Sequence, residues 1–373
     1  MPQIYANGLI KENPFFELSN QSFEKLLKLY TNKNTKYSKY IVVKPVYKNL
    51  NLETIDFDPV AFFSDALIKK LKLGKISLIF DCSIEGSHIV FPYFKRFSKG
   101  FSNNNIPLQR FYYLTGDAVE KDMHLKNNVY HINACDSMLS CPNPRLDTKA
   151  TLYFTCLSRK PRYWRSRLIY EMYNTAYKDK MLASHPKIES KNDFMNHDGF
   201  DVDGNMVEFF IKHSPMQVSQ NAPLSSTMPD KDIISTLPDV YSRAVFDVSL
   251  ETYQERAHEF ITEKTFKPML NMMPVIIWGT PGINTSGLTR LGFKTYEDWF
   301  DLTFDIEPNT EKRLKLLLDE IHRVCNMLDS IDDISSWQRK NMGVIEHNKN
   351  IIRNLLPTNV SEFTQFYKDI EAG

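Results

Sequence analysis

The chain has 373 residues, of which 42% are hydrophobic and 13% aromatic, so it is long enough for two domains with substantial cores. Its net charge of +1 excludes the overall basic field typical of nucleic-acid-coating proteins, although local basic patches remain open. Five cysteines are scattered without metal spacing, no apolar leader opens the chain, and no uncharged stretch is long enough to span a membrane. We therefore expect a cytoplasmic protein with reduced thiols and no membrane partner.

Helical and extended segments alternate in the first part of the chain. The expected elements are, in order, a helix over residues 59–73, a strand at 76–80, a helix over 89–97 and strands at 111–114 and 129–132. The first helix has a proline near its start and Gly74 at its stop. This alternation predicts an α/β domain with a parallel sheet over residues 1–140.

A loop with acidic and histidine side chains follows the strand at 76–80. Ligands of parallel sheets lie at the carboxyl ends of the strands, so residues 81–88 belong to the expected functional edge. Glu85 is the first candidate for a general base, because Gly86 leaves room for close approach, and Asp81 and His88 are further candidates. The alternatives are structural: Asp81 caps the next helix, and His88 is a surface histidine.

A linker at residues 136–149, with two prolines and no periodicity, leads to a second α/β domain expected over residues 150–340. Its first strand, at 152–156, runs into a loop and a helix with five basic side chains and no acid among them. These are Arg159, Lys160, Arg162, Arg165 and Arg167. A strand that ends in a basic loop at a helix start suits a diphosphate, whereas a solvated face or a DNA-backbone patch is the alternative interpretation.

A polar, proline-containing stretch at residues 185–240 predicts an irregular insertion or a flap, with one short strand at 206–212. Asp201 and Asp203 have the spacing of a metal-binding D-x-D triplet. In this irregular context we interpret them as part of a turn, and no metal is expected.

The richest segment is residues 256–293, read as a helix, a strand at 274–278 and a Gly/Pro turn. Lys264 and Lys267 are three apart and share a helix face, and the start of such a helix offers an anion site. Glu263 suits hydrogen bonds from sugar hydroxyls, as acidic residues do for ribose in dinucleotide folds. Trp278, at the end of the strand, either packs in the core or stacks on a nucleotide base.

The sequence FITEKTFKP, which begins at Phe260, and MPVIIWG, which ends at Gly279, resemble the donor-binding motif of the α1,3-fucosyltransferase-like glycosyltransferases. The segment from Leu288 to Tyr296 makes the chain more similar still to a branch common in phages and large viruses. The resemblance covers about the C-terminal half of the chain. It is specific as a run of linked elements and weak in any single dipeptide.

The resemblance implies an α/β fold of two facing Rossmann-like, doubly wound domains, the GT-B architecture. Helices are predicted at 311–328 and 344–356, and residues 341–373 are expected to pack back on the N-terminal domain. The resemblance also implies that Arg159 or Arg162 contacts the donor phosphates. The remaining donor-side residues that it implies are Glu251, Thr252, Thr262, Glu263, Lys264, Lys267 and Gly279.

The implied function is transfer of a hexose or pentose from a UDP- or GDP-linked nucleotide sugar to an acceptor hydroxyl, without a metal. Viral relatives suggest a hydroxymethylated pyrimidine in phage DNA as the acceptor. Basic side chains of the first half could supply the DNA surface, namely Lys69, Lys70, Lys72, Lys75, Lys95, Arg96 and Lys99. The alternatives are a saccharide acceptor, a non-catalytic DNA- or glycan-binding protein on the same fold, and a nucleotide-binding enzyme of another reaction type. A retaining enzyme would need no dedicated base.

Overall fold

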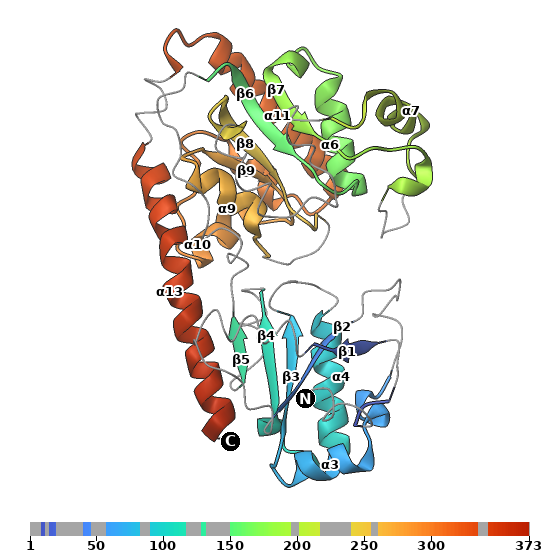
Figure 1. Cartoon of the computed structure of the whole chain (residues 1–373). Coiled ribbons are helices and arrows are strands. Elements are labelled where there is room, and N and C mark those ends of the chain that lie inside the picture. Colours follow the sequence, from blue (N-terminus) through green and yellow to red (C-terminus); the bar gives the residue numbers. More distant parts are fainter. Residues whose placement is uncertain are drawn as a thin grey trace. The chain divides into compact units, whose positions relative to one another are not determined.

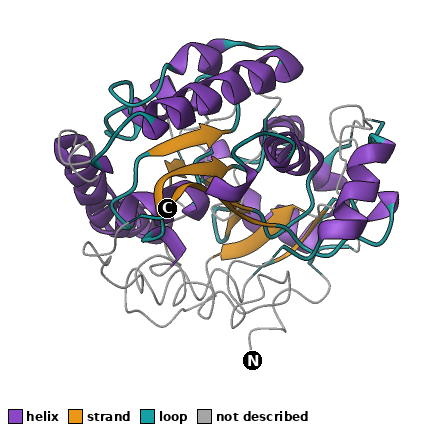
Figure 2. Cartoon of the chain, turned by 90° about the horizontal axis from the view of Figure 1, so that it is seen from above, coloured by secondary structure: helices purple, strands orange, loops and turns teal. Residues whose placement is uncertain are grey.

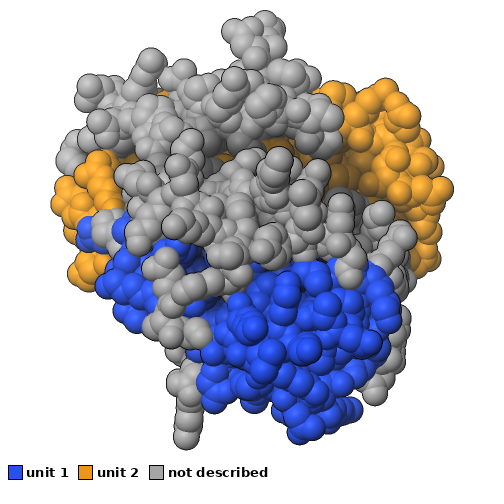
Figure 3. All heavy atoms as spheres, turned by 60° about the horizontal axis from the view of Figure 1, so that its bottom comes forward, with its two compact units in different colours: residues 1–134, 354–373 blue, residues 135–353 orange. Residues whose placement is uncertain are grey.

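The computed structural model describes residues 9–11, 15–19, 40–45, 57–82, 90–116, 128–131, 150–194, 201–216, 240–254, 260–334 and 342–372. Contacts divide the chain into two compact units, Met1–Ala134 with Asn354–Gly373, and Cys135–Arg353 (Figure 3). Each unit has its own largely parallel sheet with helices beside it (Figures 1 and 2), so the architecture is mixed α/β. None of the described helices is long and apolar enough to cross a membrane.

The sheet of the first unit has five strands in the order β1-β2-β3-β4-β5. They are β1 (Phe16–Leu18), β2 (Tyr40–Pro45), β3 (Ser77–Cys82), β4 (Phe111–Thr115) and β5 (Val129–His131). Strand β1 is antiparallel to β2, and the other neighbours are parallel. Strands β2 to β5 stand in sequence order, so the described strands of this sheet lack the reversal of a doubly wound fold.

Two different parts of the chain cover the two faces of this sheet. The crossover helices α3 (Asp65–Lys72) and α4 (Val90–Asn103) pack on the face that carries Leu78 and Phe80. The connection from β2 to β3 and the connection from β3 to β4 cross the sheet in the same direction. Because parallel crossovers are right-handed, both place their helices on the same face of the sheet. The other face carries Ile79, and residues 363–370 of the C-terminal helix α13 (Met342–Ala372) pack against it.

The helix predicted over residues 59–73 is two helices. A 3₁₀ helix, η1 (Pro59–Phe62), ends at Phe63, which adopts an extended conformation and is buried in the core. Ser64 then caps α3 by accepting a hydrogen bond from the Leu67 N–H at 3.3 Å. Gly74 follows α3 and has a φ of 65°, the left-handed conformation with which glycine commonly ends a helix. The predicted helix end at Gly74 is therefore confirmed.

The sheet of the second unit has four parallel strands in the order β7-β6-β8-β9. They are β6 (Leu152–Leu157), β7 (Met181–Ser184), β8 (Ala244–Leu250) and β9 (Val275–Trp278). The chain adds β7 on one side of β6 and then returns to add β8 and β9 on the other. This reversal is the doubly wound pattern, with its switch point between β6 and β8.

Helices lie on both faces of the second sheet. The helix α9 (Glu263–Leu270) contacts β8 and β9, and Ser249 points toward it. On the other face, Trp278 donates its indole N–H to the Trp164 carbonyl of α6 (Tyr163–Tyr173) at 3.2 Å. The Arg313 guanidinium of α11 (Thr310–Asp329) lies 5.3 Å from the Trp278 ring. Trp278 is fully buried, so it packs in the core and does not offer a face to a nucleotide base.

Several short helices complete the described elements. They are η2 (Leu108–Arg110), η4 (Lys178–Lys180), η5 (Lys191–Asp193), α7 (Gly204–His213), the π-helix η6 (Ile283–Gly287), α10 (Leu288–Arg290) and η7 (Leu302–Ile306). The strand predicted at 206–212 is wrong, because α7 occupies it and buries Met206 and Phe210, four residues apart. Asp203 caps α7 and Asp201 forms an ion pair with Lys191 at 2.5 Å, so both carboxylates have structural partners.

Candidate functional site

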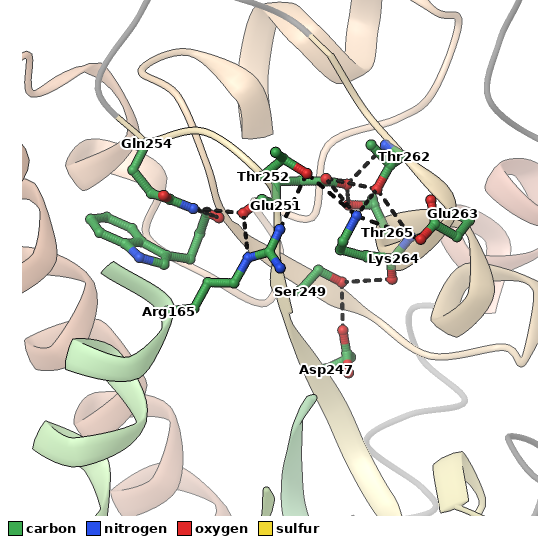
Figure 4. Close-up of polar contacts among 11 residues, drawn as sticks. Arg165, Asp247, Ser249, Glu251, Thr252, Gln254, Thr262, Glu263, Lys264 and Thr265 are labelled. Carbon is green, nitrogen blue, oxygen red and sulfur yellow. Dashed lines mark hydrogen bonds and ion pairs between the residues drawn. The ribbon is translucent and has the colours of Figure 1, made fainter. Parts of the chain in front are cut away.

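The switch point of the second sheet is where an α/β sheet is expected to bind a ligand, because crossovers to opposite faces leave a crevice at the carboxyl ends of the strands. Strand β6 leads into residues 158–162 and β8 into residues 251–254, and these two strands are neighbours. The first turn of α9 lies beside them. Arg165, Glu251, Thr252, Thr262 and Lys264 converge at this point (Figure 4).

Glu251 is a buried carboxylate that organises this site. It accepts hydrogen bonds from the Thr262 N–H at 2.9 Å, from the Thr262 hydroxyl at 2.8 Å and from the Thr265 hydroxyl at 2.8 Å. Both carboxylate oxygens therefore have protein partners. Glu251 fixes the start of α9 against the end of β8, which makes it a positioning residue for this site.

Gly279 lets the chain leaving β9 pass close to Glu251. A Cβ atom at this position would lie 2.8 Å from Ile283 Cδ1 and 3.4 Å from Glu251 Cβ. The glycine is buried, so its place in the site comes from tight packing of the loop.

Lys264 carries the positive charge of the first turn of α9. Its ammonium donates to the Thr262 hydroxyl at 2.9 Å and lies 3.5 Å from the Thr252 hydroxyl. It also lies 3.5 Å from Glu263 Oε1 and 4.0 Å from Glu251 Oε2. The side chain is 28% exposed, so the ammonium remains within reach of a ligand.

Glu263 is strongly ionised despite its surroundings. Burial alone would raise its pKa, but Lys264 and Lys267, with a smaller effect from Arg165, outweigh burial and lower the pKa to about 2. Lys267 lies one turn along α9 from Glu263. The carboxylate therefore accepts hydrogen bonds at neutral pH and donates none.

Arg165 lies beneath this group and is only 2% exposed. Its Nε–H donates to the Glu251 carbonyl at 2.9 Å, and Nη2 donates to the Thr252 hydroxyl at 3.2 Å. Burial and the nearby Arg162 lower the pKa of Arg165 to about 9, so it stays protonated at neutral pH. Arg165 links the helix after β6 to the loop after β8.

Arg162 and Arg159 occupy the loop before α6. The Arg162 guanidinium lies 5.7 Å from the Tyr253 ring, and its Nε is buried without a hydrogen bond among the described residues. Arg159 is half-buried in the same loop. Arg159 or Arg162 was predicted to contact the donor, and Arg165 was not. The buried place of Arg165 can be recognised in the sequence, because Leu168, Ile169 and Met172 follow it at helix spacing and mark the buried face of α6.

A second buried arginine joins the loops behind the site. The Arg313 guanidinium donates to the Glu307 carbonyl at 2.6 Å, to the Gln254 carbonyl and, at 3.4 Å, to the Gly279 carbonyl. Gln254 in turn donates to the Glu251 carbonyl at 2.7 Å. The loops after β8 and β9 are therefore held together from the α11 side.

Of the three candidate bases in the first half of the chain, Asp81 is among the described residues. Asp81 is a buried residue of β3, opposite Leu114 in register and on the same face as Ile79. It stands at the carboxyl end of the strand, where sequence reasoning put it. Glu85 and His88 lie outside the described residues, so their assignment stays a prediction.

The basic side chains suggested as a DNA surface are spread along two helices. Lys69, Lys72 and Lys75 are exposed around the end of α3, which leads into the amino end of β3. They stand at the opposite edge of the sheet from the Asp81 end. Lys95 and Lys99 are exposed along α4, which runs from the carboxyl edge back toward the amino edge.

Within the part of the chain that the structure describes, no three His, Cys, Asp or Glu side chains gather in a way that could hold a metal ion. No known family model matches the sequence, and no curated protein is significantly similar to it. The resemblance to the fucosyltransferase-like enzymes therefore depends on the motif alone.

Proposed function

We propose that this protein is a glycosyltransferase that uses a nucleotide-sugar donor. One observation carries the proposal: Arg162, Arg165 and Lys264 converge at the switch point of a doubly wound sheet, beside the first turn of α9. Fixed cations at such a place stabilise the charge that develops on a departing diphosphate. We propose that they do this without a metal, within a GT-B arrangement of the two units.

The roles divide by exposure. Lys264 and Arg162 reach the surface and would bind the diphosphate oxygens, while Arg165 adds positive charge from below. Glu263, ionised at neutral pH, would accept hydrogen bonds from the ribose hydroxyls. Glu251 and Thr262 hold this turn in place.

In the transfer step the acceptor oxygen forms a bond to the anomeric carbon, and the bond from that carbon to the diphosphate oxygen breaks. The electron pair leaves with the diphosphate, and a base takes the acceptor proton if the reaction inverts configuration. Glu85, Asp81 and His88 are the proposed candidates for this base.

For the acceptor we propose a hydroxymethylated pyrimidine in DNA, with a saccharide as the alternative. Activity on DNA should fall steeply with salt, because the protein must displace counterions from the phosphates. Activity on a neutral saccharide should change little over the same salt range. A flat salt response with a DNA substrate would argue against the DNA acceptor.

Calorimetric titration tests the donor site, with UDP and GDP first, then their sugar conjugates, each with and without magnesium. One nucleoside diphosphate should bind with micromolar affinity or better. Lys264→Ala and Arg162→Ala should weaken it by about tenfold to a hundredfold, as expected for a lost charged hydrogen bond. The control is Lys315→Ala, an exposed lysine of α11.

Wild-type affinity in both site variants would contradict the assignment of the donor site. Failure of every nucleotide to bind would overturn the proposed function. Tight binding without turnover on DNA or saccharide acceptors would favour the non-catalytic binding protein.

A further inference from the structure

A buried carboxyl group lies beneath the candidate site, inside the second sheet. Asp247 is 2% exposed in β8, between Thr155 of β6 and Val275 of β9 in register. The Thr155 hydroxyl contacts one carboxyl oxygen and the Ser249 hydroxyl the other. The donor site as described above does not use this group.

Ser249 connects this carboxyl group to α9. Its hydroxyl lies 3.3 Å from the carbonyl oxygen of Lys264. In an α-helix that carbonyl would accept the N–H of the residue four positions later, but residue 268 is a proline and has no N–H. The Ser249 hydroxyl is placed to donate to the Lys264 carbonyl in place of the missing N–H.

The hydrogen bonds that link Asp247, Ser249 and Lys264 can be arranged in two ways, which differ in the protonation of Asp247. The Ser249 hydroxyl has one proton and two acceptors, the Asp247 carboxyl oxygen and the Lys264 carbonyl. If Asp247 is ionised, the Ser249 hydroxyl donates its proton to the carboxylate. The Lys264 carbonyl oxygen then faces a lone pair of the Ser249 oxygen and receives no hydrogen bond from it. If Asp247 is protonated, it donates to Ser249, Ser249 donates to Lys264, and Thr155 donates to the remaining carboxyl oxygen. The protonated state therefore lets Ser249 serve both neighbours, whereas the ionised state takes the Ser249 proton away from the Lys264 carbonyl.

We propose that Asp247 is a positioning residue that holds a proton at neutral pH and, through Ser249, fixes the turn of α9 that carries Lys264. Its consequence for nucleotide binding rests on the proposed function, whereas the protonation itself does not. Burial raises the pKa of Asp247 to about 7, and it outweighs the opposing effect of the Ser249 and Thr155 hydroxyls. The titratable neighbour on β6 is Cys156, whose thiol pKa is raised by burial, and on α9 it is Lys264, whose ammonium lies toward Thr262.

The first test compares wild type with Asp247→Asn in nucleoside diphosphate binding across neutral pH. The asparagine amide donates to Ser249 as a protonated carboxyl does, so it should preserve the acid form at every pH. Wild-type affinity should fall about two- to tenfold relative to the variant as pH rises through the titration, the effect of one neutral hydrogen bond. Titration of the ligand phosphate is common to both proteins and cancels in the ratio.

The second test needs no nucleotide. Infrared or NMR detection of the Asp247 carboxyl, identified by its absence in Asp247→Asn, follows its protonation directly. Pro268→Ala supplies an N–H for the Lys264 carbonyl and frees the Ser249 proton for the carboxylate, so it should lower the pKa of Asp247. Pro308→Ala, in the exposed segment before α11, is the matched control and should leave the pKa unchanged.

An Asp247 carboxyl already ionised well below neutral pH would overturn the proposal. So would a titration that Pro268→Ala leaves unchanged, or affinities of wild type and Asp247→Asn that fall together with pH. If no nucleotide binds, the proposed function fails, and the carboxyl titration in the Pro268→Ala variant alone then decides whether Asp247 is coupled to α9.

Discussion

At the scale of single residues, the candidate site depends on buried charged groups whose partners are mostly backbone atoms and hydroxyls. The Arg165 guanidinium donates to the Glu251 carbonyl, and the Glu251 carboxylate accepts from Thr262, so the two side chains hold different segments in place (Figure 4). A buried carboxylate with three donors tolerates loss of an acceptor poorly, because each donor then stays unsatisfied. The surface cations depend on this framework for their positions.

Glu251→Gln tests that dependence. One amide oxygen cannot replace two carboxylate oxygens, so a Thr262 or Thr265 donor should lose its partner. We expect a loss of about 1–3 kcal/mol in unfolding free energy, measured by urea denaturation, with weaker nucleotide binding. Glu171→Gln, which removes a half-exposed pair with Arg167, should change stability by less than about 1 kcal/mol. Equal effects would contradict the role assigned to Glu251.

The sequence allowed some of these residues to be selected but not their roles. Glu263, Lys264 and Thr262 stand out because they form one motif at a helix start. Glu251 was expected to contact the donor, yet its oxygens accept hydrogen bonds from Thr262 and Thr265. Such a role depends on which strands are neighbours, and residue types alone do not specify that.

At the scale of elements, the loop after β9 shows how an edge strand is protected. The Asn284 side chain accepts the Ile277 N–H at 2.7 Å and donates to the Ile277 carbonyl at 2.9 Å, as a neighbouring strand would. Asn284 also donates to Asp305 at 2.8 Å. One side chain therefore covers the edge of β9 and closes the loop that contains Gly279.

Asn284→Ala should leave the buried Ile277 N–H and carbonyl without these partners. We expect the urea midpoint to fall, with an unchanged slope, by the equivalent of about 2–4 kcal/mol. Asn309→Ala, which removes the cap of α11, is the comparison and should cost about 1 kcal/mol. A smaller loss at Asn284 than at Asn309 would show that water replaces the amide.

Strand positions could be predicted because buried strands are short apolar runs. Apart from the strand expected at 206–212, the expected strands are confirmed to within about two residues. Residues 206–212 resemble a strand by composition, but the Asp203 cap and the spacing of Met206 and Phe210 favour the helix. Strand order, and with it the switch point, depends on long-range contacts that local patterns do not encode.

At the scale of the whole molecule, two buried groups in the second unit make its stability depend on pH in opposite ways. His185 contacts the Ser166 hydroxyl at 2.8 Å and stacks on Phe210, and burial lowers its pKa to about 4. It therefore contributes stability that is lost as pH falls from about 6.5 toward 4. Asp247, with its raised pKa, contributes stability present below about pH 4 and lost as pH rises through about 7.

Asp247→Asn should remove the pH dependence of stability that Asp247 causes and leave that of His185. Relative to wild type, its stability should then rise more steeply with pH between about 4 and 7, by about 3 kcal/mol in total. Urea unfolding at a series of pH values measures this difference, in which the other carboxylates cancel. Parallel curves would mean that Asp247 titrates normally.

The last turns of α13 form part of the first unit. Phe366 is fully buried against Tyr112 and Tyr130, and Tyr112 donates to the Asp369 carbonyl at 3.0 Å. Phe366→Ala should destabilise the first unit by about 3–5 kcal/mol and leave the proposed nucleotide binding of the second unit unchanged. Limited proteolysis separates the two effects. Lys368→Ala, on the exposed side of the same helix, should alter cleavage little, and an equal response would contradict this packing.

The same packing has a consequence during translation. The sheet of the first unit is complete once β5 has been synthesised, but one of its faces awaits residues 363–370, more than 200 residues later. The second unit, Cys135–Arg353, is released from the ribosome before them. Part of the apolar surface of Val42, Ile79 and Leu114 should therefore stay uncovered on the nascent chain, and exposed apolar surface of this kind is what chaperones bind. The half of the protein that is made first is the half that finishes folding last.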